Sequence, residues 1–189
     1  RDSQLQVGSR ETQAPLVRGD QDVAQHGQGG SLGSDQSSQW STLIMKLSFH
    51  GAARSVTGSR HMLEVPGFKL LLDCGLFQGR RDEAYRKNRD LGFDPKSLNA
   101  VLLSHSHIDH SGALPVLQKH GFSGKVYLTR ATADLTELML EDSARVQMSD
   151  CGYVNKQEVR KGKACVRPLY DTDDVRKLVR RFDGARYGD

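Results

Sequence analysis

The feature that most constrains this chain is a run of six residues, His105 to His110, with the sequence H-S-H-I-D-H. It directly follows the apolar run Ala100–Ser104, whose length indicates a buried strand. On extended backbone, side chains two positions apart point the same way, so His105 and His107 can converge on one point. Asp109 and His110 fall where the chain turns into the next helix and can face a second point close by. Three imidazoles and a carboxylate suit zinc or a similar divalent ion.

The types of ligand favour a catalytic metal site over a structural one. Structural zinc sites usually close with four ligands and rely on cysteine. None of Cys74, Cys151 and Cys165 lies in the cluster or forms a C-x-x-C pair. A single histidine is more often a core or surface residue than a ligand, but three within six positions, with an acid between them, are typical of a metal site.

Composition narrows the classes of protein that remain. A chain of 189 residues suits one domain with or without a tail. Its three scattered cysteines do not form a disulfide framework, so we expect a cytoplasmic protein in a reducing compartment. The apolar runs are too short to span a bilayer and no secretory signal is visible, so we expect no membrane partner.

Residues 1–44 differ from the rest of the chain. Gln, Ser, Gly and Asp dominate there and apolar residues show no period, which predicts a disordered extension before a domain over 45–189. The extension has three arginines against five acidic residues, which leaves +6 for the domain of a chain whose net charge is +4. A basic domain suits a polyanionic partner, although many basic domains bind none.

Hydrophobic patterning predicts a sheet flanked by helices. We expect strands over 45–50, 61–65, 68–72, 99–104 and 125–128, and helices over 111–120, 132–148 and 172–182. The charged segment 82–88 is helical or irregular. The first strand is expected to bury Met45, Leu47 and Phe49, and the helix over 132–148 to pack against the core with the stripe Leu135, Leu138, Met139 and Val146.

The histidine cluster, the strand before it and the helix after it resemble the signature of the metallo-β-lactamase superfamily. The segment Gly51–Glu64 resembles the opening of its β-CASP nuclease branch, and Leu72–Gly79 is similar to that branch's first motif. Leu138–Ala144 and Pro168–Tyr170 also resemble branch segments. The resemblance extends from Met45 to about the end of the chain.

The resemblance implies an α/β fold, an αββα metallo-β-lactamase-type sandwich, with two zinc ions at the sheet edge and manganese as the alternative metal. By the matching positions, His105 and His107 would hold one ion, and Asp109 and His110 the other. Asp73 would lie beneath them and orient ligands and water. Asp109 and Asp73 are therefore the candidate catalytic residues.

The chain departs from the family pattern in its later part. Members need a further histidine for the first zinc, a bridging aspartate, another histidine for the second zinc and a separate β-CASP cap domain. No histidine follows His120. We therefore expect residues 45–189 to form only the first half of the sandwich, cut before the later ligand motifs and the cap, and we expect this fragment to be inactive alone.

The resemblance implies hydrolysis of RNA phosphodiesters, as an endonuclease or a 5′ exonuclease, by hydroxide that two zinc ions activate. Arg80 and Arg81 are candidate contacts to the RNA backbone, with a solvated helix face as the alternative. Other readings are a DNA nuclease of the same branch, another hydrolase of the superfamily (thioesterase, lactonase or β-lactamase) and a non-catalytic partner subunit. The oligomeric state stays open.

Overall fold

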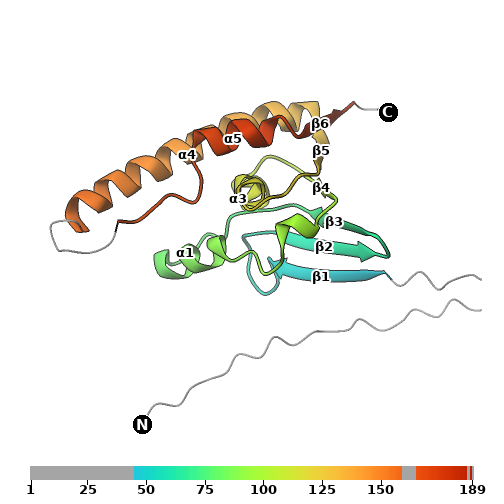
Figure 1. Cartoon of the computed structure of the whole chain (residues 1–189), viewed down its shortest axis with the longest axis horizontal. Helices are drawn as coiled ribbons and strands as arrows, with labels where there is room; N and C mark the ends of the chain where they lie inside the picture. Colours follow the sequence, from blue (N-terminus) through green and yellow to red (C-terminus); the bar gives the residue numbers. More distant parts are fainter. Residues whose placement is uncertain (1–44, 159–164, 187, 189) are drawn as a thin grey trace, which may run out of the picture. The chain divides into compact units, whose positions relative to one another are not determined.

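Six strands form one mixed sheet in the order β1-β2-β3-β4-β5-β6 (Figure 1). The computed structural model describes residues 45–158, 165–186 and 188, within the compact unit Ser41–Asp189; the predicted extension 1–44 lies outside the described residues. The strands β1, β2 and β3 pair antiparallel, and β3 to β6 pair parallel. Their bounds are β1 Lys46–Gly51, β2 Arg60–Val65, β3 Phe68–Leu72, β4 Ala100–Leu102, β5 Lys125–Thr129 and β6 Phe182–Ala185.

Helices occupy the connections between the parallel strands, because parallel neighbours can be joined only by a crossover. The connection from β3 to β4 holds α1 (Arg81–Arg89) and the short 3₁₀ helix η1 (Pro95–Ser97). The connection from β4 to β5 holds α2 (Ile108–Ser111) and α3 (Leu114–Lys119), where the sequence predicted one helix over 111–120. The connection from β5 to β6 holds α4 (Arg130–Glu158) and α5 (Thr172–Val179).

The core lies between one face of the sheet and the helices. Four strand residues on this face, at most 2% exposed, face apolar side chains of α3 and α5 in a single cluster. The strand residues are Met62, Leu71, Val101 and Val126, and the helix residues include Leu114, Leu117, Val175 and Leu178.

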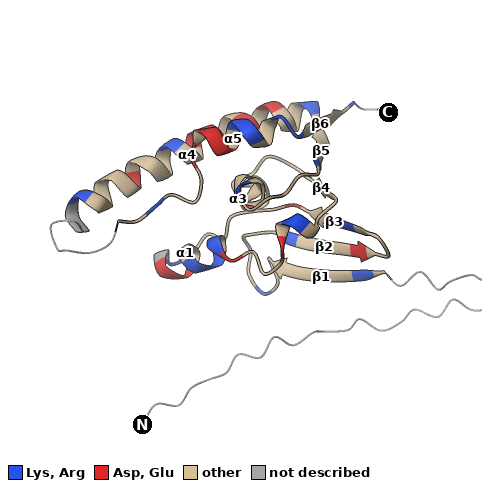
Figure 2. Ribbon diagram, viewed as in Figure 1, with Lys and Arg blue, Asp and Glu red and all other residues tan. Residues whose placement is uncertain are grey.

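The opposite face of the sheet is apolar and exposed within the described part of the chain. The strand register places five large side chains on this face, each between 44% and 58% exposed: Leu47, Phe49, Phe68, Leu102 and Tyr127. The ribbons of β1 and β2 are mostly tan in Figure 2, so few residues of these strands are Lys, Arg, Asp or Glu. The first strand was predicted correctly, but the predicted burial of its apolar face is wrong, because the helices pack on the other side.

The predicted packing face of α4 is wrong for three of its four residues, since only Met139 is half-buried. Leu135, Leu138 and Val146 are between 51% and 64% exposed, whereas Thr136, Leu140 and Ala144 are fully buried. The buried set follows an i, i+4 spacing, and its small members let the neighbouring elements approach closely. The helix therefore presents the row Thr136, Leu140 and Ala144 to the core and exposes Leu135, Leu138 and Val146.

The C-terminal ends of α4 and α5 differ from the predicted ones. The helix α4 continues ten residues beyond Met148 to Glu158. The helix α5 stops at Val179, and the segment predicted as its last turn leads into β6, which the sequence did not predict. Asp183 and Gly184 are poor strand formers. β6 forms nevertheless because its backbone pairs with β5, with Phe182 opposite Val126. No helix in the described ranges is long and apolar enough to cross a membrane.

Candidate metal centre

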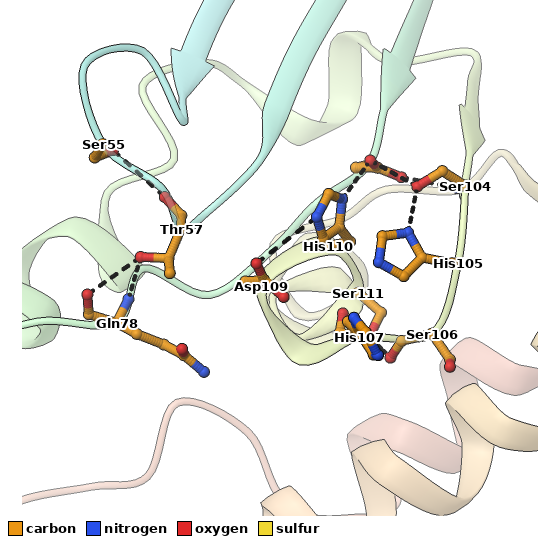
Figure 3. Close-up of polar contacts among 11 residues, drawn as sticks. Ser55, Thr57, Gln78, Ser104, His105, Ser106, His107, Asp109, His110 and Ser111 are labelled. Carbon is orange, nitrogen blue, oxygen red and sulfur yellow. Dashed lines mark hydrogen bonds and ion pairs between the residues drawn. The ribbon is translucent and has the colours of Figure 1, made fainter.

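The histidine cluster lies at one edge of the sheet, where β3 and β4 end side by side. Asp73 directly follows β3, and Ser104 and His105 follow β4 (Figure 3). Because the two strands are parallel neighbours, their carboxyl ends meet at the same edge. The backbone amide of Asp73 donates to the carbonyl of Leu102 over 3.0 Å, which continues the ladder to the start of the site.

Asp73 holds several polar groups of the cluster together. Its φ of 59° lies in the left-handed region, which aspartate tolerates better than most residues. Its Oδ1 accepts from the amide of Ser104 at 2.8 Å, and its Oδ2 accepts from the Ser104 hydroxyl at 2.9 Å. The same Oδ2 lies 2.8 Å from Nδ1 of His110. The carboxylate is only 8% exposed, so these contacts replace water.

The structure gathers the four predicted ligands in one place. The ring centroids of His105 and His107 are 4.7 Å apart, and those of His105 and His110 are 4.1 Å apart. Nε2 of His110 lies 3.7 Å from Oδ2 of Asp109. Residues that are consecutive along the chain thus present three imidazoles and a carboxylate within a few ångströms.

The rings contact one another edge to face or tilted, and their donor atoms do not point at one centre. As the side chains stand, no three histidine, cysteine, aspartate or glutamate groups of the described residues are arranged to hold a metal ion. The donor set nevertheless fits a divalent ion chemically. Nδ1 of His110 is engaged by Asp73, so Nε2 is left to bind, as is usual for metal-binding histidines. The assignment of the ligands stays a prediction.

The loop after β3 fixes the helix that carries Asp109 and His110. The amide of Cys74 donates to the carbonyl of His110 at 2.7 Å, and the amide of Ser59 donates to the carbonyl of Asp109 at 2.9 Å. A Cβ atom at Gly75 would lie 1.5 Å from that same Asp109 oxygen. Only glycine fits there, which gives the L-D-C-G segment a physical reason beyond its resemblance to a family motif.

A buried arginine, which the sequence analysis did not identify, stabilises the same loop. Arg60 is 3% exposed, and its guanidinium donates to the carbonyl of Gly75 at 3.0 and 3.1 Å. It also donates to the carbonyl of Lys87 and to Oδ1 of Asn88, at 3.2 and 3.3 Å. Asn88 in turn exchanges two hydrogen bonds with the backbone of Phe77. No sequence pattern connected residues this far apart.

Three other described histidines make their recorded contacts outside the cluster. His50 packs against Phe93 with ring centroids 4.9 Å apart, and burial lowers the pKa of its imidazole. His61 packs against Phe49 at 5.1 Å, and His120 ends α3.

Cys74 is fully buried, and this burial raises the pKa of its thiol to about 12. The side chain therefore packs as a neutral thiol.

Among the contacts recorded for the described side chains, Arg80 has none with the histidine cluster. Nε of Arg80 lies 3.8 Å from Oδ1 of Asp82, and both side chains are largely exposed. Arg81 is the first residue of α1, a helix that is banded blue and red in Figure 2. A contact of these arginines with substrate stays a prediction.

Polar side chains gathered where neighbouring parallel strands end are typical of binding sites in α/β folds, and imidazoles beside a carboxylate suit a divalent metal. The chain belongs to the metallo-β-lactamase superfamily, because the family model of that description matches residues 61–184. The described residues form one sheet with helices on one face, which corresponds to one β layer and one α layer of the predicted αββα sandwich. The family implies binding of a divalent metal.

Two curated proteins and a solved structure show the extent of the similarity. Over 125 residues the chain is 46% identical to Ribonuclease TTHA0252 of Thermus thermophilus, covering 66% of this chain and 28% of that protein. Over 132 residues it is 33% identical to transcription termination factor FttA of Methanocaldococcus jannaschii, covering 68% and 20%. The metallo-β-lactamase fold protein YhfI of Bacillus subtilis aligns with a TM-score of 0.34 and 27% identity, covering 46% and 39%. The two curated relatives agree with the predicted β-CASP branch, and the chain spans less than a third of the length of each.

Proposed function

We propose that this chain is the first part of a metal-dependent ribonuclease. The observation that carries the proposal is the contact of Asp73 with His110, at the sheet edge where His105 and His107 also lie. A carboxylate behind an imidazole is the usual support of a histidine that binds a metal. The relative with 46% identity is named as a ribonuclease, which supports RNA as the substrate.

The residues of this chain would supply part of the metal ligands and the groups that orient them. His105, His107, Asp109 and His110 would hold zinc, because imidazole and carboxylate bind this ion while leaving it acidic. A bound ion supplies a Lewis acid that lowers the pKa of water and neutralises charge on phosphoryl oxygens. Asp73 and Ser104 keep the ligand rings in place, and the loop after β3 keeps the start of α2 at the end of β4.

The substrate and the missing ligands are part of the proposal. The net charge of +6 over 45–189 suits a polyanion, although it does not distinguish RNA from DNA. The four gathered donors are fewer than a two-metal site needs. Later segments of the longer protein would supply the others, and the chain alone would not cleave RNA.

The test compares the full-length protein with the 189-residue chain on matched RNA and DNA oligonucleotides and on a thioester. We expect zinc-dependent cleavage of RNA by the full-length protein and no cleavage by the chain alone. His105→Ala should lower the RNA cleavage rate at least about 100-fold, because a ligand is lost. His120→Ala, at the end of α3, serves as the matched control and should retain activity.

Three results would contradict the proposal. Cleavage that survives both a chelator and His105→Ala would exclude a metal mechanism at this cluster. Preferred hydrolysis of the thioester would make the protein a different hydrolase of the superfamily. Equal rates on DNA and RNA would overturn the choice of substrate and leave the metal chemistry standing.

A further inference from the structure

A serine hydroxyl connects Asp73 to a second histidine of the cluster. The Ser104 hydroxyl donates to Oδ2 of Asp73 at 2.9 Å, and Oγ also lies 2.9 Å from Nδ1 of His105 (Figure 3). The amide of Ser104 donates to the other oxygen of the same carboxylate at 2.8 Å. The serine is thus held at two points, and its oxygen lies between a carboxylate and an imidazole.

Counting protons fixes the direction of each hydrogen bond. An ionised carboxylate only accepts, and a serine hydroxyl has one hydrogen to donate. Because that hydrogen goes to Asp73, Oγ of Ser104 can only accept from His105. Nδ1 of His105 must therefore carry a proton, and in the neutral ring Nε2 then has the free lone pair.

The same count applies to His110 without an intermediate group. Nδ1 of His110 lies 2.8 Å from Oδ2 of Asp73, so it donates to the carboxylate and leaves Nε2 with the lone pair. One carboxylate thus selects the same tautomer in two imidazoles, whose ring centroids are 4.1 Å apart. It acts on His110 directly and on His105 through the hydroxyl.

We propose that Ser104 is a positioning residue, whose hydroxyl transmits the hydrogen bonding of Asp73 to His105 and so holds Nε2 of His105 ready for a divalent metal. The role in metal binding rests on the proposed function, whereas the expected tautomer of His105 follows from the hydrogen bonds alone. Ser104→Ala removes the relay, and Ser104→Thr keeps a hydroxyl in the same place. The sequence analysis did not select this serine, although it directly precedes the H-x-H-x-D-H run.

The first measurement is ¹⁵N NMR of the histidine rings in the metal-free chain at about pH 9, above the ordinary range of histidine ionisation. We expect the Nδ1–H form for His105 and His110 in the wild type. Ser104→Ala should shift His105 towards the Nε2–H form and leave His110 unchanged, and Ser104→Thr should restore His105. The relay is refuted if His105 is Nε2–H in the wild type or does not respond to Ser104→Ala.

The second measurement is the affinity of the chain for zinc and for manganese by calorimetric titration. Ser104→Ala should weaken binding roughly 10-fold, at the lower end of the effect of losing a partner that orients a ligand. Ser104→Thr should recover most of the loss. Ser106→Ala is the matched control, since it removes an equal hydroxyl that has no recorded partner among the described residues. An equal loss in Ser106→Ala would mean that the segment is merely perturbed and would overturn the role of Ser104.

The two measurements separate this inference from the proposed function. A wild-type chain that binds neither ion would count against the metal, while the tautomer of His105 would still support or refute the relay. Normal metal binding with an unchanged His105 tautomer in Ser104→Ala would refute the relay and leave the proposed function intact.

Discussion

At the scale of single residues, the site depends on buried polar groups that lie outside the histidine run. Arg60 is the clearest case, because its charge is buried against neutral oxygens of Gly75, Lys87 and Asn88. Removing the guanidinium would take this donor from the carbonyls of Gly75 and Lys87, whereas Oδ1 of Asn88 would still accept from the amide of Phe77. An unsatisfied buried polar group is more costly than the net gain from an average hydrogen bond.

We therefore expect Arg60→Met to lower the free energy of unfolding by about 3 kcal/mol, measured by urea denaturation. Arg145→Met is the control, because Arg145 forms an exposed pair with Glu141 at 2.7 Å and such pairs contribute little. Equal stabilities of the two variants would show that Arg60 does not stabilise the loop after β3.

Cys74 gives a prediction for the dependence of stability on pH. Burial raises the pKa of its thiol to about 12 in the folded chain, against 9.0 for a thiol in water. Below pH 9 the thiol is protonated in both states and this residue makes stability independent of pH. Between pH 9 and 12 the unfolded thiol loses its proton first, so stability falls as pH rises.

The expected loss from Cys74 reaches up to about 4 kcal/mol at the upper end of this range. Cys74→Ala should show a shallower decline in urea denaturation from pH 9 to 12, with the contribution of Tyr170 common to both proteins. Parallel declines in the two proteins would mean that the thiol ionises in the folded state.

At the scale of elements, the start of α2 is held by backbone contacts that leave no room for a side chain at Gly75. We expect Gly75→Ala to destabilise the chain by about 3 kcal/mol and to weaken metal binding, because α2 must move away from the loop. Gly152→Ala, in the interior of α4 with no atom within 4 Å of the new Cβ, should instead be stabilising by about 0.5–1 kcal/mol. Thermal unfolding and calorimetric metal titration of both variants provide the check, and a Gly75→Ala variant as stable as wild type would refute the steric argument.

Local sequence correctly predicted the helices and strands whose hydrophobic pattern agrees with the packing that they have in the fold. The antiparallel pair β2 and β3 and the strand before the histidines combine β-branched or leucine-rich runs with a clear turn or breaker. The capping box at Asp171 and Asp174 likewise formed at the predicted start of α5. β6 was missed because its backbone pairs with β5 despite Asp183 and Gly184, so the information lies in a partner distant in sequence. The stripe on α4 was misassigned because periodicity identifies an apolar face without identifying the surface that covers it.

In the site too, local sequence predicted some residues, and others could be found only from contacts between distant parts of the chain. The three histidines and the aspartate within His105–His110 were predicted as ligands from their spacing, and Asp73 was predicted to support them from the resemblance of its segment to a family motif. Ser104 and Arg60 were not, because their roles depend on atoms that only the fold brings together. A hydroxyl or a guanidinium carries no sign in the sequence of which carbonyl or carboxylate it will meet.

At the scale of the whole molecule, the exposed face of the sheet is the main departure from a self-contained domain. Five large side chains between 44% and 58% exposed leave an apolar patch on the order of several hundred Å², as large as the largest patches of ordinary monomers. Such a patch limits the solubility of a protein.

We expect the double variant Phe49→Ser, Leu102→Ser to raise the solubility of the 189-residue chain several-fold, measured by ammonium sulfate precipitation. Each residue is already about half exposed, so the cost in stability should stay near 1 kcal/mol per site. Val56→Ser, which changes a loop residue that is 92% exposed and off the sheet, should leave solubility almost unchanged. A larger effect from Val56 than from the sheet residues would contradict a role of this face.

Asp73 and Ser104 are 31 positions apart in the sequence, yet two hydrogen bonds join them just beyond the carboxyl ends of β3 and β4. A metal ion bound by the neighbouring histidine rings would stabilise this contact between distant segments of the chain. Any ligand that binds only the native form raises the melting temperature. A simple heat-denaturation series with different salts would then rank candidate metals by how far each shifts the transition. The preferred ion would be identified before a substrate is known.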